Sequence, residues 1–226
     1  NYIHQWNLNT AWNVNSSSSS YANKSPIFNT SVGWFANNVV GFNFKSDGSE
    51  IYVTHNNTSH IATYPLSTTW DVTTRGSLSS SRYYFEVCGD LNAKGNNIQW
   101  KSDGSKYYLV SGEGTSSNHS TNALVQFEPS SAWTMTNFQG YNDLPGHDSS
   151  YTDFHNMRTG TPGDYDLGST YTGYFWHNNG TYLFCFAQND INRWTCSTPY
   201  DFKTAGSKIR FGGWSATPNF QGGIID

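Results

Sequence analysis

Residues 44–53 read Phe-Lys-Ser-Asp-Gly-Ser-Glu-Ile-Tyr-Val, and residues 100–110 repeat them in outline as Trp-Lys-Ser-Asp-Gly-Ser-Lys-Tyr-Tyr-Leu-Val. A third, diverged copy at residues 176–184 reads Trp-His-Asn-Asn-Gly-Thr-Tyr-Leu-Phe. Asp-Gly or Asn-Gly between aromatic and β-branched runs is a strong signal for a β-hairpin, because glycine adopts the positive φ of the turn without a Cβ clash. Each copy therefore predicts two antiparallel strands, and the chain is a repeat protein.

A second signature follows each hairpin after one further strand. It reads Leu-Ser-Thr-Thr-Trp-Asp-Val at residues 66–72, and related segments occur at residues 129–135 and 196–202. A fourth example at residues 8–14 has no hairpin before it. We call the aromatic residues of this signature the anchors; they are Trp12, Trp70, Trp133 and Tyr200.

The two signatures together predict four strands per unit. An inner and a second strand flank the glycine turn, a third strand follows, and an outer strand is expected to start at the anchor. Thin antiparallel units that recur along a chain indicate blades packed around an axis, so we predict an all-β fold, a β-propeller of about four four-stranded blades. The whole chain, residues 1–226, would be one domain. Its units are residues 1–20 (partial), 30–74, 95–138, 170–205 and 206–226 (partial).

Composition supports an all-β interpretation and argues against two classes of partner. Aromatic residues make up 17% of the chain and charged residues only 12%, which indicates a core of large rings between sheets. The net charge of −4 argues against nucleic-acid binding, which needs a clustered basic face. No apolar run is long enough for a membrane span, so we expect no membrane insertion.

The two ends of the chain read as complementary fragments of one unit. Residues 2–6 predict a third strand without its hairpin, and residues 220–226 resemble the approach to an inner strand. One hypothesis is a ring whose last blade is shared between the termini or left incomplete; the other is an excerpt of a longer repeat protein. An incomplete blade leaves strand edges that a partner chain could pair, so we expect a homo-oligomer.

The pattern Phe-x-x-Asp-Gly-x-x-x-Tyr-Val, followed by Leu-Ser-Thr-x-Trp-Asp-Val-Thr-Thr, resembles a β-propeller-type repeat of marine bacteriophage and environmental bacterial surface proteins. The resemblance is carried by residues 42–74, 98–135 and, more weakly, 174–204. It implies an extracellular or virion-associated protein in which the repeat is a structural or attachment module. The partners that it implies are other subunits of the particle. It supplies no catalytic motif.

Three cysteines occur, of which Cys185 and Cys196 fall in one unit. Cys185 lies on the predicted second strand and Cys196 at the end of the third, so a disulfide between them is one alternative. The other is that both are small buried apolar side chains. The turn between the strands pairs position 185 more nearly with Arg193 than with Cys196.

The long insertion between the second and third units carries residue types that could bind a divalent ion or act as acids. These are Asp143, His147, Asp148, Asp153, His155, Asp164 and Asp166. Their spacing matches no known metal site, and they are better interpreted as turn residues, so we predict no metal and no cofactor. Carboxylate pairs for glycoside hydrolysis would be Glu86 with Asp90, or Asp148 with Asp153. No nucleophile elbow, phosphate loop or dinucleotide fingerprint occurs.

Two tryptophans are candidates for a glycan-binding site. Trp34 and Trp214 lie between anchors and inner strands, whereas Trp100 and Trp176 align with Phe44 and are expected in the core. We predict a non-enzymatic structural or attachment module of an extracellular particle, most specifically a bacteriophage virion protein of the tail, fibre or capsid surface. The alternatives are a secreted lectin that binds a cell-surface glycan and a glycoside-active enzyme.

Overall fold

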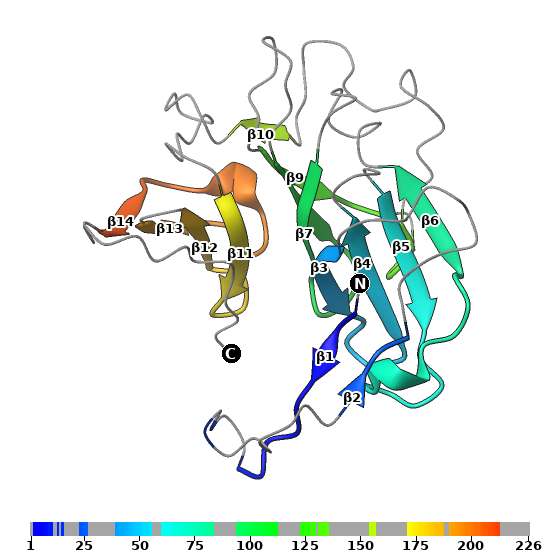
Figure 1. The fold of residues 1–226 in the computed structure, drawn as a ribbon. Coiled ribbons are helices and arrows are strands. Elements are labelled where there is room, and N and C mark those ends of the chain that lie inside the picture. Colours follow the sequence, from blue (N-terminus) through cyan, green and yellow to red (C-terminus); the bar gives the residue numbers. More distant parts are fainter. Residues whose placement is uncertain are drawn as a thin grey trace.

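The computed structural model describes residues 2–10, 13, 15, 23–26, 39–55, 60–83, 94–112, 123–129, 131–135, 154–156, 171–187 and 190–212. Within these ranges the regular structure is antiparallel β-sheet with short 3₁₀ turns, which confirms the all-β prediction. Three sheets have four strands each and follow one another along the chain (Figure 1). None of the helical segments in the described ranges is long and apolar enough to cross a membrane.

Each four-stranded sheet is built in chain order from its first to its fourth strand. The first sheet contains β3 (Val39–Phe44), β4 (Glu50–His55), β5 (His60–Pro65) and β6 (Ser80–Tyr83). The second contains β7 (Lys94–Trp100), β8 (Tyr107–Gly112), β9 (Ala123–Phe127) and β10 (Phe154–Asn156). The third contains β11 (Tyr171–His177), β12 (Tyr182–Ala187), β13 (Asp190–Thr195) and β14 (Ile209–Gly212). The predicted number of strands per unit is thus confirmed for three units.

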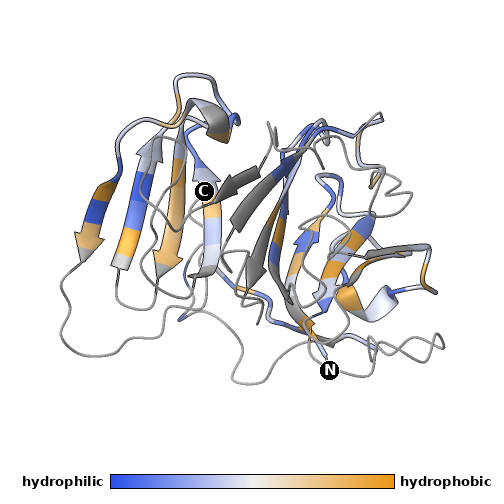
Figure 2. Cartoon of the chain, turned by 90° about the horizontal axis from the view of Figure 1, so that it is seen from above, coloured by the Kyte–Doolittle hydropathy of each residue, from blue (hydrophilic) through white to orange (hydrophobic). Residues whose placement is uncertain are grey.

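The sheets are arranged like blades. The first strands β3, β7 and β11 face a common centre, and β6 and β14 lie at the periphery (Figure 1). The strand β7, the first strand of the second sheet, packs against both β3 and β11. Seen from above, hydrophobic and hydrophilic residues are interspersed along the strands of the third sheet (Figure 2). This mixture is expected when the two faces of a sheet differ in what they contact.

Large rings fill the junctions between sheets, as the composition predicts. One cluster joins Tyr52 and Ile61 of the first sheet to Trp100 of the second. Another joins Tyr108 of the second sheet to Trp194 of the third. Trp100 and Trp176 are only 5% and 7% exposed, which confirms their predicted core positions. The sheets are therefore held face to face by aromatic side chains.

The anchors do not start the outer strands, and this prediction is wrong. Trp70 and Tyr200 have φ angles of 65° and 59°, which extended strands do not adopt. The 3₁₀ turns η2 (Val72–Thr74) and η3 (Phe202–Thr204) follow them, and β6 and β14 begin only afterwards. In the first sheet the Asp71 side chain accepts a hydrogen bond from the Thr73 N–H at 2.9 Å and caps η2. A capped 3₁₀ turn therefore stands just after the anchor, where the outer strand was expected to begin.

The N-terminal residues form a separate pair of strands, β1 (His4–Gln5) and β2 (Asn23–Lys24). They occupy the places of the third and fourth strands of a unit, and Ile3 packs against the first sheet. A strand within residues 2–6 is therefore confirmed. The anchor Trp12 and residues 213–226 lie outside the described ranges.

Candidate interaction surfaces at the sheet junctions

The rings of the three described anchors, Trp70, Trp133 and Tyr200, each lie directly on the glycine of their own hairpin turn. Gly48 has a φ of 71°, and a Cβ built on it would lie 2.5 Å from atoms of the Trp70 ring. The Trp70 N–H also donates a hydrogen bond to the Gly48 carbonyl at 2.9 Å. Gly104 under Trp133 has the same contacts. Glycine is therefore required both by the turn conformation and by the close approach of the ring.

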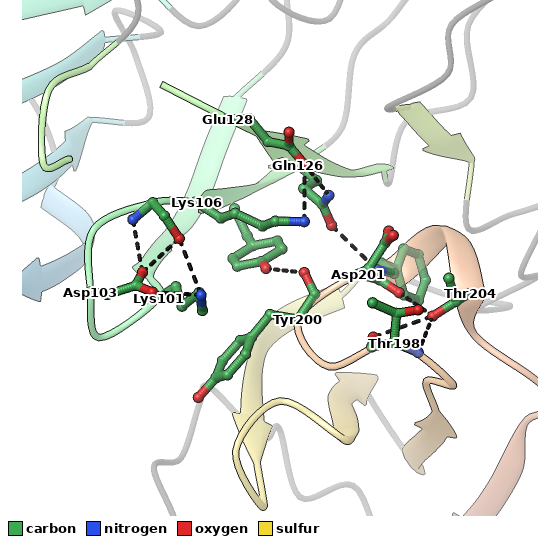
Figure 3. A network of polar contacts seen from close by, with 12 residues as sticks. Lys101, Asp103, Lys106, Gln126, Glu128, Thr198, Tyr200, Asp201 and Thr204 are labelled. Atoms are coloured by element: carbon green, nitrogen blue, oxygen red, sulfur yellow. Dashed lines mark hydrogen bonds and ion pairs between the residues drawn. The ribbon is translucent and has the colours of Figure 1, made fainter. Parts of the chain in front are cut away.

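A tyrosine hydroxyl links the anchors Trp133 and Tyr200 to the preceding sheet. Tyr52 on β4 donates a hydrogen bond to the carbonyl of Trp133 at 2.8 Å. Tyr108 on β8 donates in the same way to the carbonyl of Tyr200 (Figure 3). Burial raises the pKa of both tyrosines, so both hydroxyls stay protonated and can donate. The first–second and second–third junctions thus contain equivalent hydrogen bonds.

A glutamine on the third strand of a unit makes a second hydrogen bond to a neighbouring sheet, this time as an acceptor. Gln126 Oε1 accepts a hydrogen bond from the Phe202 N–H at 3.2 Å (Figure 3). Gln5 Oε1 accepts one from the Val72 N–H, also at 3.2 Å. Both N–H groups lie two residues beyond an anchor. In the first sheet Thr63 takes the equivalent place, and its shorter side chain leaves a buried hydroxyl without a hydrogen bond in the described structure.

The polar rim of the second–third junction holds exposed ion pairs (Figure 3). Lys101 Nζ lies 2.6 Å from Asp103 Oδ2, and Lys106 Nζ lies 2.9 Å from Glu128 Oε1. Hydrogen bonds from Lys101 and Ser105 lower the pKa of Asp103 to about 2. Both carboxylates pair with neighbouring lysines at the exposed rim, an arrangement that suits a solvated surface better than acid catalysis.

One face of the third sheet, on the side away from the second sheet, is apolar and hollowed. We call it the end face; it is lined by Phe175, Phe184, Phe186, Ile191 and Phe211. The hollow has a volume of about 290 Å³. The rings of Phe175 and Phe184 are stacked, with centroids 4.8 Å apart. Phe211 is 41% exposed, which is high for so large an apolar side chain.

Arg193 lies beside the end face. Its guanidinium carbon is 4.9 Å from the centroid of the Tyr182 ring and 5.7 Å from that of Phe211. Its Nε is buried and makes no hydrogen bond within the described structure. A cation held over two rings beside an apolar hollow is suited to bind a carboxylate attached to an apolar group.

The two cysteines of the third unit are free thiols in this structure, so the disulfide that the sequence left open is not formed. The register pairs Cys185 with Asn192, which leaves Cys196 beyond the opposite end of the same ladder. Both side chains are buried, and burial raises the pKa of Cys185 and raises that of Cys196 to about 12. They pack as small apolar groups in the second–third junction.

The other candidate residues fall outside the described ranges. These are Trp34 and Trp214 for glycan binding, and Glu86, Asp90, Asp143, His147, Asp148, Asp153, Asp164 and Asp166 for acid or metal chemistry. His155 lies on β10, which pairs with β9. Among the residues that the structure does describe, no three His, Cys, Asp or Glu side chains are grouped as metal ligands would be.

No protein-family model and no curated protein matches the chain. Among solved structures it is similar to a candidate 6-phosphogluconolactonase from Bacteroides fragilis, at 13% identity and a TM-score of 0.48, over 93% of this chain and 49% of that one. A second candidate 6-phosphogluconolactonase, from Bacteroides uniformis, has 10% identity and a TM-score of 0.40, with coverages of 75% and 42%. The WD40 repeats of RRP9 have 10% identity and a TM-score of 0.42, with coverages of 80% and 41%. The chain spans about half or less of the length of these structures.

Sequence reasoning missed the residues that link the sheets. Tyr52 and Tyr108 occupy the same position of the repeat, as do Gln5 and Gln126. Their recurrence in register is the signal that could have found them. It was hidden because Tyr and Gln also occur at many surface positions, and a sequence does not reveal which side chains face the next unit.

Proposed function

We propose that the chain is a non-enzymatic structural or attachment module of an extracellular particle, with a bacteriophage virion as the specific setting. The observation that carries the proposal is that one kind of junction is repeated. In both copies, the backbone carbonyl of an anchor accepts a hydrogen bond from a tyrosine hydroxyl of the preceding sheet. Such junctions make a stiff body of interlocked sheets. A stiff body is what a module needs in order to hold a binding surface in a fixed orientation.

For the architecture, we favour a propeller of about four blades in which β1 and β2 are the two outer strands of the fourth blade. The arrangement of the three sheets around a centre supports this view (Figure 1). So does the Gln5 link to the first sheet, which matches the Gln126 link between complete blades. The mass of the natural protein tests the closed ring, because a value well above 25.3 kDa would reject a ring built from residues 1–226 alone.

The particle role is tested by fractionation. In a culture of the source, the chain should sediment with particles on a density gradient, in a constant ratio to a major particle protein and after a wash in 1 M salt, which removes surface electrostatic adsorption (screening length about 3 Å). The other particle subunits, and further copies of this chain, are the expected partners. Recovery only in the soluble fraction would reject the particle role.

Glycan binding is the second candidate, and Trp70 favours it. One face of this ring lies on Gly48, while the side chain remains 49% exposed. An exposed ring held rigidly can stack on the apolar face of a sugar. Binding to a glycan array that is lost in Trp70→Ala, Trp34→Ala or Trp214→Ala would support a lectin. An array without signal for the unaltered chain would reject it.

A further inference from the structure

The hollow of the end face has a buried floor and an exposed edge. Phe175 and Phe186 are almost completely buried and form the floor, whereas Phe211 at the edge is exposed. Arg193 holds a positive charge beside this edge, over the rings of Tyr182 and Phe211. We propose that the end face is a binding site for a small monocarboxylic acid with an aromatic or branched aliphatic body. The body would fill the hollow, and the carboxylate would pair with the Arg193 guanidinium.

The size and the lining of the hollow fit a small molecule. Its volume of about 290 Å³ lies at the lower end of the usual range for small-molecule sites, about 300–1,000 Å³. Its five lining residues are phenylalanine or isoleucine, so their side chains contribute no polar group. Phe175 stacks on both Phe184 and Phe186, with ring centroids 4.8 and 5.6 Å apart, and these rings support one another. The part of a ligand inside the hollow therefore has to be apolar, and its burial is favourable because it leaves water.

The charge of Arg193 favours an acidic group on the ligand. Ion pairs within the described residues neutralise Lys45, Lys101 and Lys106. Arg193 takes part in none of these pairs, and its buried Nε makes no hydrogen bond within the described structure. A guanidinium beside an apolar surface attracts a carboxylate, which it can bind through two parallel hydrogen bonds.

The repeat shows that position 193 differs in function from its equivalents. Gln126 and Gln5 stand at this position in other units, and each amide oxygen accepts a backbone N–H of a neighbouring sheet. A guanidinium has only donors, so Arg193 cannot accept such an N–H. Phe184 likewise lacks the hydroxyl by which Tyr108, at the equivalent position, donates to a neighbouring sheet. The end face thus lacks the side-chain groups for both hydrogen bonds that join sheets, which favours a ligand with an acceptor group over a further repeat unit.

Phe211 connects the charge to the hollow. Its ring lines the hollow, and the guanidinium carbon of Arg193 lies 5.7 Å from the centroid of the same ring. A carboxylate on Arg193 and an apolar body against Phe211 are therefore close enough to belong to one small molecule. The ligand class is accordingly an acid whose carboxylate is joined to its body by a short linker, and 4-phenylbutyrate is a suitable probe.

Isothermal titration calorimetry of the full chain with 4-phenylbutyrate tests the site. The matched ligand is 4-phenylbutyramide, which has the same body but no charge. The unaltered chain should bind one molecule of the acid, about tenfold or more tightly than the amide, because only the acid makes a charge-assisted hydrogen bond. Arg193→Gln should lower the affinity for the acid to that for the amide. Its unchanged affinity for the amide would show that the hollow is intact.

Three further variants separate the charge from the hollow. Arg193→Lys keeps the charge without the planar fork and should retain part of the preference for the acid. Phe211→Ala should weaken the binding of acid and amide alike, since both bury their body against this ring. Arg75→Gln is the control for loss of a guanidinium over a ring: Arg75 lies 4.8 Å from the Tyr64 ring in the first unit, and its Nη1 donates to the Gly76 carbonyl. This control should leave both affinities unchanged.

Three results would overturn the proposal. One is the absence of saturable binding of 4-phenylbutyrate by the unaltered chain. Another is an equal affinity for acid and amide, or an affinity for the acid that Arg193→Gln leaves unchanged. The third is sedimentation of the chain as a dimer that Phe211→Asp converts to a monomer, because a second copy would then cover the end face. Binding is measured on the chain alone, so the outcome does not depend on the particle role.

Discussion

The junction between the second and third sheets and the end face of the third sheet use the same positions of one repeat for different purposes. In the junction, Tyr108 donates a hydrogen bond to the Tyr200 carbonyl, and Gln126 accepts one from the Phe202 N–H. On the end face, Phe184 and Arg193 occupy these positions and cannot make the same bonds. The sheet scaffold is the same in the two regions, and the side chains at these two positions differ in whether they can form hydrogen bonds with the backbone of a following sheet.

Buried rings contribute most of the stability of the second–third junction. Its hydrogen bonds are directional and fix how the two sheets meet. Trp194, Tyr108 and Phe202 are almost completely buried there. Phe211 on the end face remains 41% exposed. Substitutions of buried residues in the junction should therefore cost more stability than substitutions of exposed residues on the end face.

The largest difference is expected for ring removal. Trp194→Ala should lower the free energy of unfolding by about 4 kcal/mol, because a fully buried side chain of the junction leaves a cavity. Phe211→Ala on the end face is the control and should cost at least about 2 kcal/mol less. Urea unfolding measures both. Equal losses would mean that the two regions are equally packed.

The second-largest effect is expected when the turn glycine beneath an anchor ring is replaced. Gly180 has a φ of 81°, and a Cβ there would clash with the Tyr200 ring. Gly180→Ala should cost about 2 kcal/mol through backbone strain and displacement of the anchor. Gly206→Ala in the same sheet is the control, since a Cβ there would lie 3.5 Å from the Thr195 carbonyl oxygen, an ordinary van der Waals contact. A Tm unchanged by Gly180→Ala would refute the role of the turn.

A smaller effect is expected for the hydroxyl that crosses the junction. Tyr108→Phe should cost about 1 kcal/mol, because the Tyr200 carbonyl loses its donor. The reverse change on the end face, Phe184→Tyr, should bring no gain, since no anchor carbonyl of another sheet lies opposite it among the described residues. Guanidinium unfolding curves of both variants test this. A stabilised Phe184→Tyr variant would contradict the distinction between the two faces.

The smallest effect is expected at the exposed rim. The pKa of Asp103 is lowered from 3.8 to about 2 when the chain is folded, mainly by hydrogen bonds from Lys101 and Ser105. Its contribution is therefore present above about pH 4 and is lost as the pH falls toward 2. Asp103→Asn should cost less than about 1 kcal/mol at pH 7, because the group is largely exposed. The stability difference between the variant and the unaltered chain should shrink over that pH range and in high salt.

Much of the fold could be predicted from local patterns. The glycine turns predicted the hairpins because a positive φ beside alternating residues has few other solutions. The recurring anchors predicted the repeat, but the prediction that the outer strands start at the anchors is wrong. Trp70 and Tyr200 look like strand residues, yet their ring contact with the turn glycine holds them in a left-handed conformation. That contact joins segments separated in sequence, so local propensity does not reveal it.

The sequence by itself determined the all-β class, the four-stranded units and the core positions of Trp100 and Trp176, because strand periodicity and turn chemistry are local properties. Only the tertiary structure decided that Tyr52 and Gln126 reach into neighbouring sheets, that Cys185 and Cys196 stay apart, and that one sheet face ends in a hollow beside Arg193. These features depend on which faces of separate sheets meet. A linear pattern does not contain that information, since it is set by the twist and packing of whole sheets.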